Sequence, residues 1–334
     1  MNTPPAAPAP EAIVVIGASL GGVDALLQLA RALPRDFPAP VAIVLHIGLQ
    51  PSILPELLAR AGARARHPRD GDPLVPGTVY VAPTDHHLLV ERDCVRLSRA
   101  ARENHTRPAI DPLFRTAALA FGPAAVGVVL TGHLDDGTAG LAAIKACGGI
   151  AIVQDPDEAI APDMPRSALQ NVEVDHCAPL AEIVPLLQRL LALRRPATRT
   201  GPPEQLVQEQ AMMNGDHPME NLAAIATPTQ LTCPECGGTL SEVRDSKPLR
   251  YRCHTGHAFT ARTLENAQAE STAHALQASL RALKEREMLL RRMAAVSRSI
   301  GEEPQAQAGL EEADRVHAQA RRLAELLLEE TGGA

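Results

Sequence analysis

The chain has 334 residues and a formal net charge of −7, and 45% of its residues are hydrophobic but only 2% are aromatic. This length suits one large domain with a smaller companion, or two ordinary domains. An acidic chain with few rings is a poor candidate for nucleic-acid binding. It has no run of about 20 apolar residues that could span a membrane, and its N-terminus lacks a secretory signal pattern. We therefore expect a cytoplasmic protein with reduced cysteines.

The first large segment, residues 12–193, alternates short aliphatic runs with helical patterns. This alternation predicts an α/β fold with a doubly wound, mostly parallel sheet. The expected strands are 13–16, 41–45, 126–130 and 150–153, and the expected helices are 23–33, 138–146 and 180–193. Residues 77–97 resemble strands or a hairpin with no helix between them, which predicts an antiparallel edge on the sheet.

The rest of the chain divides by composition. We expect a disordered Pro/Ala-rich tail over 1–11, a linker over 194–228, a small cysteine-containing module over 229–261 and a helical hairpin over 262–330. The two hairpin helices are separated by GEEP at 301–304. Their charged faces favour a self-packed hairpin, and the alternative is a docking surface for a receptor bundle or another signalling protein.

A candidate nucleophile lies directly after the first expected strand. The segment Gly17-Ala18-Ser19-Leu20-Gly21-Gly22 fits G-x-S-x-G, the strand–turn–helix elbow that exposes a serine hydroxyl. The helix N-terminus behind the elbow favours developing negative charge. The alternative is the phosphate-binding turn of a nucleotide-binding dehydrogenase. That turn needs glycine at position 19 and an acidic residue after the second strand, where this chain has Ser19 and His46.

A base and an acid are expected at the same sheet edge. His46 directly follows the strand over 41–45, so it should lie beside Ser19, where nucleophilic catalysis needs a proton acceptor. An Asp at another strand end would orient the imidazole. Asp135 and Asp136 follow the strand over 126–130, and Asp155 follows the next one. The spacing does not choose among these three residues.

Five motifs occur in one order between residues 12 and 190: GASLGG, VLHIG, RPAIDPLF, LTGHLDDG and DMPRSA. Together they resemble the catalytic domain of the chemotaxis protein-glutamate methylesterases of the CheB type. The resemblance implies a triad of Ser19, His46 and Asp136 that needs no cofactor. It implies hydrolysis of glutamate γ-methyl esters on the cytoplasmic helices of methylated chemoreceptors, opposite to a methyltransferase, and in some members deamidation of glutamine.

Some positions depart from the family pattern or have no assigned role. Leu20 stands where the family often has a small or hydroxyl residue, and His133 where it often has Met. Backbone N–H groups near the elbow and at 132–134 are expected to bind the oxyanion. Arg107, Asp111 and Arg166 are expected either to bind the receptor helix or to brace loops.

The expected regulation also departs from the family. Typical members carry an N-terminal receiver domain, and the short segment before the first strand here predicts that phosphorylation in cis does not control activity. The rival hypothesis is a non-catalytic signalling adaptor built on the esterase fold.

The last motif is a cysteine cluster. Cys233-x2-Cys236, sixteen residues, then Cys253-x3-His257 has the spacing of a structural Cys3His zinc site. His254 is the alternative fourth ligand. A closed site with four protein ligands leaves no position for catalytic water, so the expected zinc is structural.

Overall fold

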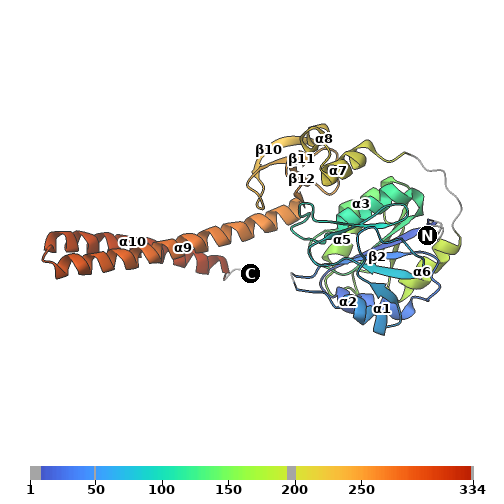
Figure 1. The fold of residues 1–334 in the computed structure, drawn as a ribbon, viewed down its shortest axis with the longest axis horizontal. Helices are drawn as coiled ribbons and strands as arrows, with labels where there is room; N and C mark the ends of the chain where they lie inside the picture. Colours follow the sequence, from blue (N-terminus) through green and yellow to red (C-terminus); the bar gives the residue numbers. More distant parts are fainter. Residues whose placement is uncertain (1–8, 49, 194–200, 332–334) are drawn as a thin grey trace, which may run out of the picture. The chain divides into compact units, whose positions relative to one another are not determined.

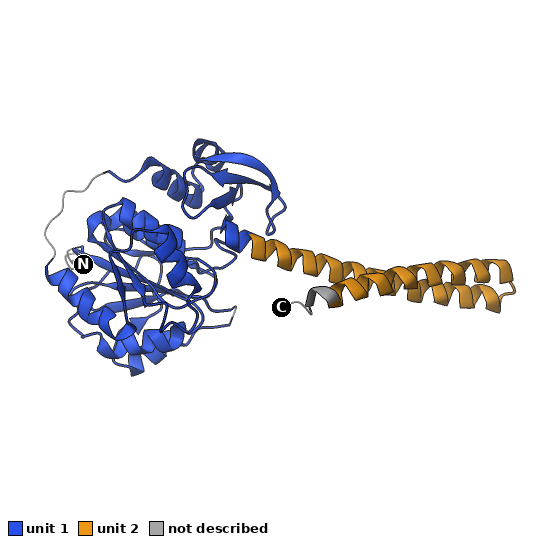
Figure 2. Cartoon of the chain, turned by 180° about the vertical axis from the view of Figure 1, so that it is seen from behind, with its two compact units in different colours: residues 1–264 blue, residues 265–334 orange. Residues whose placement is uncertain are grey.

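The computed structural model describes residues 9–48, 50–193 and 201–331 (Figure 1). The chain forms two compact units, residues 1–264 and 265–334 (Figure 2). In the described ranges, no helix is both long enough and apolar enough to cross a membrane. The expected tail over 1–11 lies mostly outside these ranges, as does the start of the expected linker.

The larger unit contains a seven-stranded sheet in which every strand pair is parallel. The strands are β1 (Ile13–Ala18), β2 (Val41–Leu45), β3 (Arg64–Arg66), β4 (Thr78–Val81), β7 (Ala125–Val129), β8 (Ile150–Gln154) and β9 (His176–Ala178). Their order is β3-β4-β2-β1-β7-β8-β9. The predicted doubly wound sheet is confirmed, and its winding direction reverses between β1 and β7, where sheets of this kind carry their ligand sites.

The predicted antiparallel edge is wrong. Strands β5 (His87–Val90) and β6 (Val95–Ser98) form a separate two-stranded antiparallel sheet. Leu88 and Val95 of this hairpin are buried in the same hydrophobic cluster as Phe114 of a covering helix. The hairpin therefore uses its apolar face for helix packing, while β3 occupies the sheet edge beside β4.

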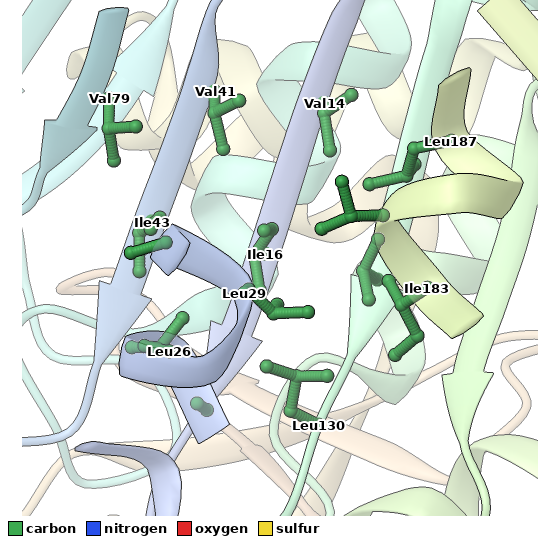
Figure 3. Close-up of a cluster of buried hydrophobic side chains, with 14 of the residues drawn as sticks. Val14, Ile16, Leu26, Leu29, Val41, Ile43, Val79, Leu130, Ile183 and Leu187 are labelled. Carbon is green, nitrogen blue, oxygen red and sulfur yellow. The ribbon is translucent and has the colours of Figure 1, made fainter. Parts of the chain in front are cut away.

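Helices cover both faces of the sheet. They are α1 (Gly22–Ala32), α2 (Leu54–Arg60) and α6 (Leu180–Ala192) on one face, and α3 (Ile110–Phe121), α4 (Thr138–Ala146) and α5 (Asp163–Asn171) on the other. Both faces need covering because the side chains of a strand alternate between them, and those of β1 enter two buried clusters. Val14 and Ile16 pack with Leu26 and Ile183 on one side (Figure 3), and Val15 packs on the other.

The interval expected to be a linker contains secondary structure from residue 204 onward. It forms α7 (Glu204–Asn214), α8 (Pro218–Ile225) and strand β10 (Ala226–Thr232). The buried residues of α7 are Leu206, Glu209 and Met212. One of these three is a charged side chain, so an apolar periodicity could not indicate this helix.

A second sheet follows in the same unit. It is antiparallel and contains β10, β11 (Thr239–Val243), β12 (Arg250–Cys253) and β13 (Ala258–Thr260) in that order. The loop at 102–104 from the α/β domain lies along β13, where the backbone N–H of Asn104 donates to the carbonyl of Ala258 at 2.7 Å. We call residues 226–260 the cysteine module.

The smaller unit is a helical hairpin, as predicted. It consists of α9 (Ala261–Ser299), whose first residues belong to the larger unit, and α10 (Glu303–Thr331). The buried side chains are small, with Ala294 on α9 and Ala306, Ala313 and Val316 on α10. A Cβ at Gly309 would lie 3.2 Å from the Cβ of Ala294, so small residues allow close packing here.

Two buried carboxylates and three arginines join the cysteine module to the α/β domain. Arg115 and Arg252 both donate to Glu103, at 2.7 and 2.9 Å. Arg250 donates to Glu209 at 2.7 Å, and Arg252 lies 3.4 Å from the same carboxylate. Burial alone would raise the pKa of Glu103, but the adjacent guanidinium groups lower it below its usual value. Both acids therefore remain charged inside the protein.

Replacing one member of this network should be costly. We expect Glu103→Gln to lower the free energy of unfolding by about 3–5 kcal/mol, because two buried guanidinium groups lose their counter-charge. Urea titration measures this loss. The control is Glu91→Gln, an exposed acid 3.7 Å from Arg96, which should change stability by less than about 1 kcal/mol. Equal losses in both variants would contradict a dominant role for the buried pair.

His87 is a second buried polar group of the α/β domain. Its Nε2 lies 3.1 Å from the carbonyl of Ala101, and its Nδ1 accepts the backbone N–H of Ala109 at 3.2 Å. This pattern requires the neutral ring, with the proton on Nε2. Burial lowers the pKa of His87 below 6.5.

This shift makes folding stability sensitive to pH. Below pH 6.5 the unfolded chain binds a proton at this residue that the folded chain does not, so stability falls as pH falls. The slope from this residue should approach 1.4 kcal/mol per pH unit, roughly, until the folded pKa is reached. His87→Gln should flatten denaturation midpoints between pH 6.5 and 5, whereas the exposed His217→Gln should not. An unchanged slope in His87→Gln would rule out this origin.

Candidate active site and metal centre

The candidate active site lies at the carboxyl ends of β1, β2 and β7. Ala18 pairs with Leu45, so Ser19 and His46 follow neighbouring parallel strands at the same level. The backbone N–H of His46 donates to Ala18 at 3.1 Å, and that of Ser19 donates to Thr131 at 2.9 Å. Backbone pairing therefore fixes the three loops against one another.

The elbow at Ser19 depends on glycine at two positions. Gly21 caps α1 with a left-handed φ of 77°, which glycine adopts without strain. A Cβ at Gly132 would lie 2.7 Å from the Cβ of Ser19 and 2.1 Å from the sulfur of Met164. Ser19 thus packs closely against the loop after β7, while its side chain stays partly exposed.

His46 and Asp136 form a direct pair, with Nε2 of the ring 2.7 Å from Oδ2 of the carboxylate. Asp136 is buried and also accepts the backbone N–H of Ile110 at 2.7 Å and that of Gly137 at 2.9 Å. Burial acts to raise the pKa of Asp136, but the hydrogen bonds, that from His46 foremost, lower it below its usual value. This carboxylate therefore stays ionised beside the imidazole.

The other two acids that the spacing left open lie elsewhere. Asp135 accepts the hydroxyl of Thr260 at 2.7 Å, and burial raises its pKa to about 6. Asp155 accepts the backbone N–H of Asp157 within its own turn. Asp136 is the member of this set that contacts His46.

Asp136 takes Nε2 of His46, which leaves Nδ1 as the ring nitrogen that can accept a proton. Within the described ranges, no hydrogen bond joins the hydroxyl of Ser19 to this ring. Catalytic hydrogen bonds are often long before substrate binds. The pair is therefore arranged as a base and its orienting acid next to a partly exposed serine.

The loop after β7 offers fewer backbone N–H groups to an oxyanion than the sequence predicted. The backbone N–H of Gly132 donates to Ala161 at 2.9 Å, so this amide is already used. The His133 side chain is largely exposed and lies 3.1 Å from Asp163. Of the amides expected at 132–134, that of Gly132 is therefore unavailable for an oxyanion.

Two of the three unassigned polar residues brace loops. Arg107 donates to Asp85 at 2.6 Å and to the carbonyl of Ala100 at 2.8 Å. Asp111 is buried and accepts the backbone N–H groups of Gly137 and Gly140 at 3.0 and 2.6 Å, at the start of α4. Arg166 is exposed on α5.

Asn104 is a site residue that the sequence did not indicate. Its Nδ2 donates to Asp136 at 2.7 Å and to Asp111 at 2.8 Å. It is buried, and its φ of 51° lies in the left-handed region, which Asn tolerates better than most residues. A single Asn in a loop has no motif or period, so no signal in the sequence could have singled it out.

The candidate metal centre contains the four expected ligands. The ligand atoms of Cys233, Cys236, Cys253 and His257 all lie within 4.8 Å of one another. The sulfurs of Cys236 and Cys253 are 3.8 Å apart, and a tetrahedral site with Zn–S bonds of 2.3 Å requires about 3.8 Å. The alternative ligand His254 is outside this group and packs against Gly238. The donor set and its spacing therefore fit zinc.

Comparison with known proteins places residues 14–187 in the CheB methylesterase family. A protein-glutamate methylesterase/protein-glutamine glutaminase of Anaeromyxobacter dehalogenans is 41% identical over 188 residues, which are 56% of this chain and 55% of that protein. A putative enzyme of the same name from Leptospira interrogans is 39% identical over 183 residues, 53% of this chain and 93% of that protein.

A solved structure agrees with these sequences. The Thermotoga maritima CheB methylesterase catalytic domain matches with a TM-score of 0.51 and 32% identity, over 54% of this chain and 98% of that one. This chain thus spans about half the length of some curated relatives and nearly all of others. Because the family match covers residues 14–187, this chain belongs to the CheB methylesterase family.

Proposed function

We propose that this protein is a protein-glutamate methylesterase that hydrolyses glutamate γ-methyl esters on the helical domains of methyl-accepting chemoreceptors. The observation that carries the proposal is the hydrogen-bonded pair of the buried Asp136 and the partly exposed His46 beside Ser19, in a chain of the CheB family. The relatives' names also include glutaminase activity, so we extend the proposal to the deamidation of receptor glutamines. The opposing reaction is methyl transfer to the same glutamates.

In the proposed mechanism, His46 accepts the proton of the Ser19 hydroxyl as its oxygen attacks the ester carbonyl. Asp136 stabilises the imidazolium that forms. The proton then passes from His46 to the departing methoxide, which releases methanol and leaves an acyl-enzyme on Ser19. Water, deprotonated by His46, hydrolyses that ester and restores the serine.

The oxyanion formed in each step needs backbone donors. We assign this role to the amides of the elbow after Ser19 and to that of His133, since Gly132 already donates to Ala161. The N-terminus of α1 adds its positive potential at the same place. None of these steps needs a cofactor.

Loss of the nucleophile tests the mechanism. We expect Ser19→Ala to reduce methanol release from methylated receptor by on the order of 10⁴-fold, as removal of a triad member does in serine hydrolases. The control is Ser279→Ala, which removes a hydroxyl bonded only within its own helix. A rate for Ser19→Ala equal to that of the control would show that another group is the nucleophile.

The same variant separates an enzyme from the adaptor hypothesis. A fluorophosphonate probe should label the wild-type chain at Ser19, and His46→Ala should abolish the labelling, because the hydroxyl reacts only when a base activates it. If neither Ser19→Ala nor His46→Ala changes the labelling, the result would instead favour a non-catalytic adaptor.

We also propose that Cys233, Cys236, Cys253 and His257 bind one structural zinc ion in the cytoplasm. The support is the 3.8 Å sulfur separation and the closed set of four donors. Small modules that bury little apolar surface usually need such a cross-link. Zinc would supply folding stability here and no chemistry at Ser19.

Metal analysis tests this site. Purified protein should contain about one equivalent of zinc, and Cys233→Ser with Cys253→Ser should lose it and lower the melting temperature. Cys177→Ser is the control, because this cysteine is exposed and lies outside the ligand group. Wild-type protein without zinc, or a double variant that retains it, would contradict the proposal.

A further inference from the structure

The side chain of Asn104 connects the cysteine module to the triad acid. On one side, its Oδ1 accepts the backbone N–H of Thr260 at 3.1 Å and the hydroxyl of Thr263 at 3.2 Å. On the other side, its Nδ2 donates to Asp136 and to Asp111. Each polar atom of the amide thus has two partners, one set from the end of the module and the start of α9, and one set from the α/β domain.

These partners permit one orientation of the amide. If the amide were flipped, its oxygen would face the two carboxylates, and its NH₂ group would face the donor N–H of Thr260. Oδ2 of Asp111 and the N–H of Thr260 would then lose their partners, and each such buried unsatisfied group costs about 1–3 kcal/mol. Thr260 and Thr263 therefore determine that Asn104 presents donors to Asp136.

The backbone of Asn104 is fixed from the same direction. Its N–H donates to Ala258 at 2.7 Å, and Glu103 forms a parallel bridge with Ala258. The Glu103 carboxylate in turn accepts Arg252 of the module. The loop that carries Asn104 is thus held by β13 and by the buried pair of its own Glu103 with Arg252, so both contacts come from the cysteine module.

A second contact reaches the neighbouring acid. The hydroxyl of Thr260 donates to Asp135 at 2.7 Å and accepts the backbone N–H of Thr263 at 3.1 Å, so it also caps α9. Asp135 directly precedes Asp136 in the chain. The end of the cysteine module thus contacts the triad acid through Asn104 and the residue before that acid through Thr260.

We propose that Asn104 is a positioning residue for the Asp136–His46 pair and that the docked cysteine module sets its orientation. This inference deepens the proposed function, on which it rests. Correct placement of the imidazole requires Asp136 to keep both its charge and its direction. Misplacement by about 1 Å can reduce a rate by about 10²-fold, so the module becomes a condition for full esterase activity although it provides no catalytic group.

The direct test removes the amide and keeps the backbone. Asn104→Gly suits this purpose, since glycine accepts the left-handed φ of 51°. We expect kcat for methanol release to fall by about 10–100-fold, with KM changed by less than about twofold. Thermal unfolding checks that the variant is folded at the assay temperature. A folded variant with wild-type kcat would overturn the proposal.

The second test acts from the first turn of α9, which directly follows the module. Thr263→Val removes one donor to Asn104 and should lower kcat by several-fold, roughly in line with a partial loss of orientation, whereas Thr263→Ser retains the hydroxyl and should restore the rate. The matched control is Thr272→Val, the same change on the same helix, where the hydroxyl bonds only to Gln268. Equal kcat values for Thr263→Val and this control would overturn the link from Asn104 to the module and the α9 turn that continues it.

Failure of the proposed function can be told apart from failure of this inference. The rate of Ser19 labelling by the fluorophosphonate probe depends on His46 and Asp136 but not on the receptor. If wild-type protein releases no methanol yet is labelled, slower labelling of Asn104→Gly still supports positioning. If both proteins are labelled at the same rate, the positioning role is wrong whatever the substrate is.

Discussion

The geometry of the proposed active site depends on one buried carboxylate, Asp136. It accepts hydrogen bonds from the ring of His46, from backbone amides and from Asn104. An ionised group without such partners would be too costly to bury. The same bonds that keep it charged also fix its direction, so the electrostatics and the orientation of the base have a common origin. The parallel pairing of β1 and β2 then places Ser19 next to the oriented ring.

A second set of buried charges joins the cysteine module to the α/β domain. Glu103 pairs with Arg115 of the α/β domain and with Arg252 of the module. Glu209 of α7 pairs with Arg250 of the module. Buried pairs of this kind contribute less to net stability than apolar packing, but they tolerate few alternative geometries. The module is therefore docked in one arrangement, which is what the contacts at Asn104 require.

The sequence predicts the parts of this protein that follow local patterns. Aliphatic runs and the helices between them indicate the parallel sheet, and the G-x-S-x-G elbow and the strand-end histidine indicate Ser19 and His46. The short ligand spacings indicate the cysteine cluster. The choice of Asp136 over Asp135 rests on the family resemblance. The two residues are adjacent in one loop, so their distances along the chain from Ser19 and His46 differ by a single position and do not distinguish them.

The missed features share a different physical basis. Helix α7 buries Glu209 rather than a full apolar stripe, so its stability comes from tertiary ion pairs that no local period encodes. Asn104 contacts Asp136 on one side and, on the other, the backbone of Thr260, which lies 156 residues later in the chain. Hydrogen-bond networks between distant segments depend on the completed fold, so no local sequence pattern predicts them.

Thermodynamic linkage gives this arrangement a consequence in both directions. If docking of the module favours the competent orientation of Asn104, then any ligand that binds more tightly to the competent triad must favour docking by the same factor. Zinc, by stabilising the folded module, would act on the same equilibrium from the other end. Helix α9 starts at Ala261, directly after the residue that contacts Asp135. A change in the first turn of that helix therefore acts on Thr260 and Thr263, the residues that orient Asn104, before it can affect any catalytic group.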